Sequence, residues 1–171
     1  MEYPQRKHAR YRWHDYNGGL YFITICVKDK KHLFGRIENH QITFTEIGEI
    51  AACHVQEIPL HWNGVKVISS VVMPNYVHLI IHIDGQRISQ EHSFAATPRR
   101  GPTLGGLHSV LAAVIGGYKS GVTRYANSRG IEFGWQNGFH DHIIKDNDSY
   151  EKIMDYIVNN VYKWSDDCYF S

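Results

Sequence analysis

The feature of this sequence that most constrains its fold is a pair of strand patterns joined by Pro74-Asn75. Residues 65–73 are rich in valine, and residues 76–83 are mostly apolar. Because strand side chains alternate with a period of two, the second strand presents two different faces. One face carries Tyr76, His78, Ile80 and His82, and the other carries Val77, Leu79, Ile81 and Ile83. A short turn between two such strands predicts an antiparallel hairpin, so the chain is expected to contain an antiparallel sheet.

Strands and helices alternate along the rest of the chain, which indicates an α+β fold. Further strands are expected where β-branched and aromatic residues gather, at residues 20–27, 41–44 and 139–144. Helices are expected at residues 45–57 with an end near Pro59, at residues 107–122, and after a capping box of Asp148 and Glu151. Gly116 and Gly117 each cost the second helix roughly 1 kcal/mol relative to alanine, which predicts a bend or a close contact there.

Length and composition fit one domain spanning residues 1–171, with a basic N-terminal arm at 1–17 and a mobile loop at about 84–106. There is no apolar run of about 18 residues and no apolar N-terminus, so neither a membrane span nor a secretory signal is expected. Cys26, Cys53 and Cys168 are far apart, which argues for a reducing, cytoplasmic location and against structural zinc. A net charge of +1 neither indicates nor excludes nucleic-acid binding.

The C-terminal helix pattern carries a polar pair beside its apolar stripe. The stripe consists of Tyr150, Ile153, Met154, Ile157, Val158 and Val161. At about 100° per residue, Tyr156 and Asn160 lie outside this stripe and one turn apart on the same flank. Periodicity alone would describe them as an ordinary surface tyrosine and a helix-end residue.

Several short motifs follow one another in a recognisable order. They are Tyr-Phe-Ile-Thr at 21–24, Met-Pro-Asn-x-Val-His at 73–78, Tyr-Lys-Ser-Gly at 118–121, Trp-Gln at 135–136, His-Ile-Ile at 142–144 and Asp-Tyr-Ile-Val-Asn-Asn at 155–160. Together they resemble the REP-associated tyrosine transposases, which are single-tyrosine transposases with a histidine–hydrophobe–histidine (HUH) motif. The resemblance covers most of the chain. It implies a ferredoxin-like α+β fold, with an antiparallel β-sheet and α-helices packed on one face.

The resemblance implies a metal-dependent transposase or nuclease that cleaves single-stranded or hairpin DNA through a 5′-phosphotyrosine intermediate. Tyr156 matches the family's nucleophile, and His78 and Asn160 match ligands of a Mg²⁺ or Mn²⁺ ion. The flank with Tyr156 and Asn160 is therefore expected to face His78, within one chain or across a homodimer. His142 matches a family position without an assigned role.

Two positions depart from the family's pattern. Tyr76 stands where the first histidine of the HUH motif is normal, and a neutral phenol is a weak metal ligand. An impaired enzyme is one consequence; the alternative is a domesticated module that binds hairpin DNA without cutting it. Val161 replaces a proline that commonly follows the asparagine, which predicts a helix running slightly further.

Basic and aromatic residues complete the expected DNA-binding set. Arg10, Arg12, Lys119 and Arg124 are candidates for contacts with the DNA backbone, and Trp135 is a candidate for stacking on an unpaired base. A position in the hydrophobic core would suit Trp135 equally well. The sequence does not distinguish a monomer from a homodimer.

Overall fold

The computed structural model describes residues 19–87, 110–167 and 169 of the chain. Its strands are β1 (Gly19–Cys26), β2 (Gly35–Glu38), β3 (Gln41–Phe44), β4 (Val65–Met73), β5 (Tyr76–Ile83) and β6 (His140–Ile143). Its helices are α1 (Glu46–His61), α3 (Val110–Ser128) and α4 (Asn147–Val158), with short 3-10 helices η1 (Lys28–Lys30) and η2 (Trp164–Asp166). The basic arm, and all of the expected loop beyond Arg87, lie outside the described residues.

A four-stranded antiparallel sheet in the order β4-β5-β1-β6 forms the centre of the molecule. The predicted hairpin is confirmed, because β4 and β5 pair from Met73 and Tyr76 at the turn to Val65 and Ile83 at the far end. β1 pairs with β5 along its whole length, which places Thr24 directly opposite His78. A separate two-stranded sheet joins β3 to β2, a strand that the sequence pattern did not reveal.

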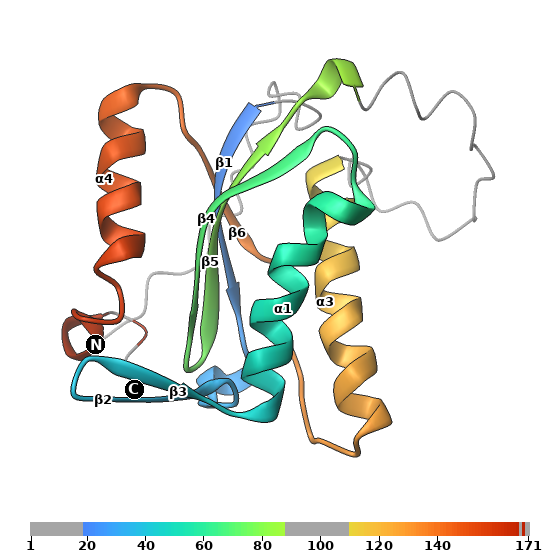
Figure 1. Ribbon diagram of the computed structural model, residues 1–171, viewed down its shortest axis with the longest axis vertical. Coiled ribbons are helices and arrows are strands. Elements are labelled where there is room, and N and C mark those ends of the chain that lie inside the picture. The colour runs from blue at the N-terminus through green and yellow to red at the C-terminus, as the bar shows by residue number, and fades with distance from the viewer. Residues whose placement is uncertain (1–18, 88–109, 168, 170–171) are drawn as a thin grey trace.

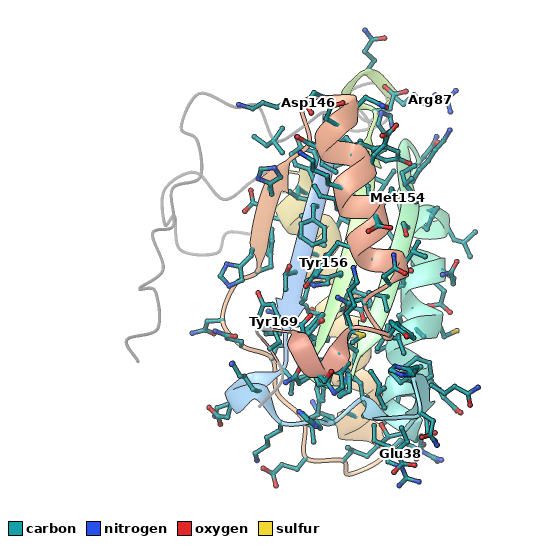
Figure 2. The ribbon with its side chains drawn as sticks, turned by 90° about the vertical axis from the view of Figure 1, so that its left-hand side faces the viewer. Glu38, Arg87, Asp146, Met154, Tyr156 and Tyr169 are labelled. Atoms are coloured by element: carbon teal, nitrogen blue, oxygen red, sulfur yellow. The ribbon has the colours of Figure 1, made fainter. Side chains whose placement is uncertain are left out.

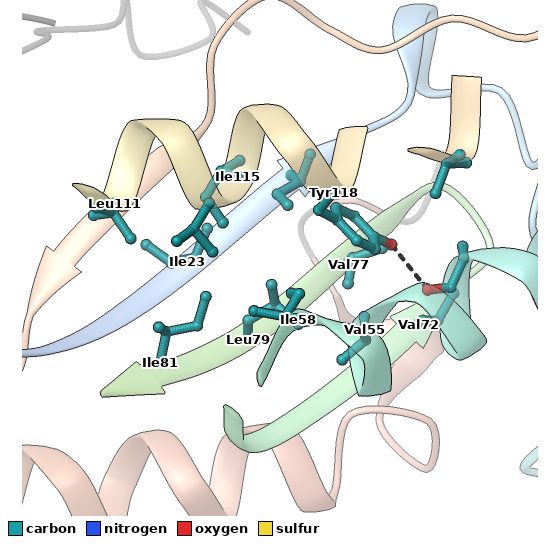
Figure 3. Close-up of a cluster of buried hydrophobic side chains, with 14 of the residues drawn as sticks. Ile23, Val55, Ile58, Val72, Val77, Leu79, Ile81, Leu111, Ile115 and Tyr118 are labelled. Atoms are coloured by element: carbon teal, nitrogen blue, oxygen red, sulfur yellow. Dashed lines mark hydrogen bonds between the residues drawn. The ribbon is translucent and has the colours of Figure 1, made fainter. Parts of the chain in front are cut away.

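The two faces of β5 differ in the way that the alternating pattern predicts. Val77, Leu79 and Ile81 point into the main hydrophobic core, which lies between the sheet and the helices α1 and α3 (Figure 3). Ile58 of α1 and Ile115 of α3 contribute to the same core. This burial of aliphatic side chains is the main source of the fold's stability.

The antiparallel α+β architecture is confirmed, but the expectation that the helices pack on one face of the sheet is wrong, because they cover both faces. α1 and α3 lie on one face, and α4 lies on the opposite face (Figure 1). The apolar stripe of α4 explains this position, because Ile157 and Ile153 pack in a second cluster with Phe22 and Ile80 from the outer face of the sheet. α4 therefore lies over the sheet face that carries His78.

Two predicted helix boundaries need correction: the end of α1 near Pro59 and the N-cap of α4. α1 starts after the N-cap Thr45 as predicted, but it continues through Pro59 to His61, with the buried Ile58 packed in the core. The N-cap of α4 is Asp146 rather than Asp148, because Asp146 Oδ1 accepts a hydrogen bond from the backbone N–H of Ser149 at 2.8 Å.

The C-terminal end of α4 also differs from the prediction. The helix ends at Val158, so Val161 does not prolong it. None of the described helices is both long and apolar enough to cross a membrane.

Two glycines in the helices have opposite surroundings. A Cβ added at Gly48 of α1 would collide with the backbone carbonyl of Phe34, whereas a Cβ at Gly116 of α3 would meet nothing within 4 Å. A bend or a close contact was predicted at Gly116 and Gly117, and no tight contact is found at either; the tightly packed glycine of α3 is Gly121, where a Cβ would lie 2.7 Å from His54 Cδ2.

These surroundings predict opposite effects of alanine on stability. Gly48→Ala should destabilise the fold by about 2–3 kcal/mol, because a backbone carbonyl cannot move aside without shifting the chain. Gly116→Ala should stabilise it by about 0.5–1 kcal/mol, since alanine loses less backbone entropy in a helix. Urea unfolding of both variants tests this, and equal midpoints would contradict the packing described here.

Candidate active site

His78 lies at the centre of the sheet face beneath α4. It is 1% exposed, and its Nδ1 lies 2.9 Å from the hydroxyl of Thr24 on the neighbouring strand. The Phe22 ring packs against it with centroids 4.9 Å apart. Burial lowers the pKa of His78 to about 4, so the imidazole is neutral at pH 7. A neutral imidazole offers one nitrogen lone pair as a proton acceptor or metal ligand.

Tyr156 lies in the last turns of α4 (Figure 2), and its hydroxyl contacts this histidine. Its hydroxyl lies 3.2 Å from His78 Nε2 and 3.1 Å from Asp167 Oδ2, and the residue is 38% exposed. Burial, together with the negative charge of Asp167, raises the pKa of Tyr156 to about 12. The side chain is thus a neutral phenol at pH 7, in contact with two groups that can accept its proton.

Tyr76 occupies a more enclosed position on the same face. It is fully buried, and its hydroxyl lies 2.7 Å from Asn160 Oδ1 and 2.8 Å from Asp167 Oδ2. A phenol has one proton, so it donates to one of these two oxygens at a time. Burial, with the adjacent Asp167 charge, raises the pKa of Tyr76 far above its ordinary value. Tyr76 is therefore a hydrogen-bond donor here, with no negative charge to offer a metal ion.

Asn160 is buried at 2% exposure, although periodicity placed it beside the core stripe. The reason is the early end of α4: the chain turns after Val158, and the backbone N–H of Asn160 bonds to Ile157 O at 3.3 Å. This turn carries the amide inward. There its Oδ1 accepts from Tyr76, and its Nδ2 lies 3.3 Å from Asp167 Oδ2.

Asp167 is the member of the site that the sequence pattern missed. Its Oδ2 lies within hydrogen-bond distance of Tyr76, Tyr156 and Asn160, and its Oδ1 accepts the backbone N–H of Tyr169 at 2.8 Å. It follows the 3-10 helix η2, at whose start a buried tryptophan packs in the cluster that contains Tyr76. That tryptophan was the available signal, since a large apolar side chain shortly before Asp167 indicates that this segment packs against the rest of the fold.

The structure brings His78, Asn160, Tyr76 and Tyr156 together within one chain, as expected. It does not place the candidate DNA-binding residues beside them. Lys119 donates to the backbone carbonyls of Gln136 and Gly138, both at 3.0 Å, and burial lowers its pKa. Trp135 donates to Lys119 O and packs against the main core, in agreement with the alternative prediction of a position in the hydrophobic core.

The remaining basic candidates are elsewhere. Arg124 lines a groove formed by residues of α1 and α3. These two helices cover the face of the sheet opposite α4 (Figure 1), the helix that carries Tyr156. Arg10 and Arg12 lie outside the described residues. His142 is exposed on the edge strand β6, opposite Phe22 of β1.

The donor atoms suit a hard divalent cation in kind. One imidazole nitrogen, one amide oxygen and one carboxylate are available, a mixed set of the type that Mg²⁺ and Mn²⁺ accept. Tyr76 does not fit such an ion, because it remains protonated and donates a hydrogen bond to Asn160 Oδ1 or Asp167 Oδ2, two of the oxygens that would bind the metal. Within the described ranges, no cluster of three or more His, Cys, Asp or Glu side chains is arranged to hold a metal ion. Any site here would therefore combine acidic, imidazole and amide ligands.

Comparisons with known proteins identify the fold and one relative of the chain. No family model matches the chain. An uncharacterised protein of Haemophilus influenzae is 34% identical over 167 residues, which cover 94% of this chain and 88% of that protein. A solved structure described as a REP-associated tyrosine transposase bound to a REP hairpin aligns with a TM-score of 0.58 and 18% identity, over 90% of this chain and 72% of its own. The chain thus belongs to one family with the Haemophilus protein, and its fold is that of the REP-associated tyrosine transposases.

Proposed function

We propose that this protein is a transposase-like endonuclease and strand transferase that acts on hairpin-bearing single-stranded DNA. The observation that carries the proposal is the contact between Tyr156 and His78, 3.2 Å apart in the same chain. A half-exposed phenol beside a buried, neutral imidazole is a suitable arrangement for a nucleophile and its activating group. The DNA class is suggested by the solved transposase of the same fold, which is bound to a hairpin.

The reaction would be a transesterification with Tyr156 as the nucleophile. The phenol oxygen forms a bond to the scissile phosphorus, and the bond to the 3′ oxygen breaks. The products are a 5′-phosphotyrosine and a free 3′-hydroxyl, and the reverse reaction rejoins strands. The phenol must lose its proton as it attacks, because its raised pKa makes it a weak nucleophile. Asp167 Oδ2, at 3.1 Å, is an available proton acceptor. His78 Nε2, at 3.2 Å, is a second acceptor only while it holds no metal ion, because a neutral imidazole has a single lone pair.

A divalent ion would assist this reaction from the same face of the sheet. His78 and Asn160 would hold Mg²⁺ or Mn²⁺, and the bound ion would stabilise the charge that develops on the phosphate. We also propose that DNA is contacted by the basic and aromatic candidates Arg10, Arg12, Lys119, Arg124 and Trp135. Of these, Lys119 would have to give up its two carbonyl partners before its ammonium met a phosphate.

A binding module without cleavage is the second candidate function. The position of Tyr76 favours it, because a protonated phenol takes the place of a metal-binding histidine and donates to Asn160 or Asp167. Such a protein would bind hairpin DNA through the same fold, with Tyr156 retained as a structural side chain.

The two functions differ in one measurement. With hairpin-bearing single-stranded DNA and Mn²⁺, the proposed enzyme should form a covalent adduct that survives a denaturing gel, and a 3′-labelled strand should remain attached to the protein. DNA binding without any adduct, across hairpins with varied flanking sequence, would reject the enzyme and support the binding module.

A further inference from the structure

The geometry points to Asp167 as a metal ligand of this site, where it supplies the anionic donor that Tyr76 cannot. The inference rests on the proposed function, because it concerns the ion that would serve the Tyr156 reaction. Asp167 follows the buried Trp164 near the end of the described chain, far in sequence from the strand that carries His78.

Charge balance is the first argument. Among the described residues, Asp167 is the only carboxylate hydrogen-bonded to Tyr76, Tyr156 and Asn160. None of the ion pairs found in the described part of the chain involves Asp167. A partly buried carboxylate whose partners within the described residues are phenol, amide and backbone N–H groups carries local negative charge, which a divalent cation would offset.

Position is the second argument. The Tyr156 hydroxyl contacts both Asp167 Oδ2, at 3.1 Å, and His78 Nε2, at 3.2 Å. The Tyr76 hydroxyl contacts both Asp167 Oδ2, at 2.8 Å, and Asn160 Oδ1, at 2.7 Å. The three candidate donor atoms are thus linked through two phenol oxygens. Movement of the partly exposed Tyr156 phenol away from its two acceptors would open space between Asp167 and His78 for an ion.

The environment of His78 provides a third argument. Its Nδ1 lies 2.9 Å from Thr24 Oγ1, so a proton on Nδ1 can be donated to that oxygen. In this tautomer Nε2 keeps its lone pair on the side of Tyr156 and Asp167. A second hydrogen bond that orients the ring in this way is usual for metal-binding histidines.

Asp167 has an alternative, structural role, as an acceptor that holds the segment after η2 against the site. Both roles predict that its removal perturbs the protein. They differ in metal affinity, and above all in metal preference, because a structural acceptor has no influence on which ion binds.

Manganese binding to the full chain tests the inference directly. Loss of the free Mn²⁺ signal in electron paramagnetic resonance should give a dissociation constant that Asp167→Asn raises by about tenfold or more, since affinity for hard cations follows the number of charged ligands. Asp148→Asn removes the same charge from the exposed first turn of α4 and should leave the constant unchanged. Equal Mn²⁺ affinity in Asp167→Asn and the unchanged protein would overturn the inference.

A change of metal preference separates a ligand from a structural acceptor. Asp167→Cys should weaken Mn²⁺ binding and strengthen Cd²⁺ binding, because a thiolate is a soft ligand. Asp148→Cys is the control, as it adds the same thiol outside the site. Cd²⁺ affinity that is no higher in Asp167→Cys than in Asp148→Cys would overturn the inference, even if Asp167→Asn fails to fold.

The two proposals fail in different ways. If the unchanged protein forms the adduct but Asp167→Asn leaves Mn²⁺ affinity unchanged, only the ligand assignment is wrong. If Mn²⁺ binding depends on Asp167 but no adduct forms with any hairpin, the ligand assignment stands and the nuclease proposal is rejected.

Discussion

Replacing Tyr156 by phenylalanine is expected to abolish the covalent protein–DNA adduct while leaving hairpin affinity nearly unchanged. Phenylalanine keeps the ring that packs edge-on against Phe22 at 6.2 Å, and it removes the oxygen that would attack phosphorus. The lost hydrogen bonds to His78 and Asp167 involve a residue that is 38% exposed, so water can replace the hydroxyl. Denaturing gels measure the adduct, and fluorescence anisotropy measures the affinity.

Tyr162→Phe is the matched control for this variant. Tyr162 follows α4 closely and is 64% exposed, and its ring stacks on His40 with centroids 4.2 Å apart. It lies outside the hydrogen-bond network of His78, so its hydroxyl should be dispensable for cleavage. An adduct that persists in Tyr156→Phe would contradict the nucleophile assignment and would direct attention to another tyrosine of the chain.

The hairpin and the faces of its second strand could be predicted from local pattern alone. A proline-asparagine turn defines where β4 ends and β5 begins, and alternation then decides which side chains share a face. The pairing of Met73 with Tyr76 follows from that turn. The pairing of Thr24 with His78 joins two strands 54 positions apart in the sequence, and the pattern did not predict it. The resemblance to a known family added the expectation that Tyr156 would meet this face, which periodicity could not supply.

The rest of the site depends on contacts between distant parts of the chain. Asp167 meets Tyr76 across 91 positions of sequence, and no repeating pattern surrounds it. Asn160 is buried because α4 stops at Val158, and the position of a helix end is set by the packing around it. The placement of α4 on the outer face likewise depends on Phe22 and Ile80, two apolar side chains on a face that also carries polar residues.

The departure at Tyr76 leads to the other large expected effect. Tyr76→His should strengthen Mn²⁺ binding by on the order of tenfold or more, and should raise any cleavage rate with it. The change has two parts. It places a neutral imidazole two residues from His78 on the same strand face, and it removes the phenol that donates to Asn160 or Asp167. Both parts leave more lone pairs available to one ion.

Tyr76→Phe separates these two parts. Phenylalanine removes the hydroxyl without adding a ligand, so a gain seen in both variants would come from the release of Asn160 and Asp167. A gain confined to Tyr76→His would come from the new imidazole. Because Tyr76 is fully buried beside Trp164, histidine leaves unfilled space and lowers stability, so both variants must first be shown to be folded by circular dichroism.

Combining Tyr76→His with His78→Ala tests whether the two positions bind the same ion. If both residues act on one ion, the double variant Tyr76→His with His78→Ala should lose the gain in Mn²⁺ affinity, a non-additive result that distant sites would not give. Unchanged Mn²⁺ binding and cleavage in folded Tyr76→His would mean that this strand face does not hold a metal ion. The protonated Tyr76 would then be a structural donor that fixes Asn160 and Asp167, and binding of hairpin DNA without cleavage would become the better account of the protein.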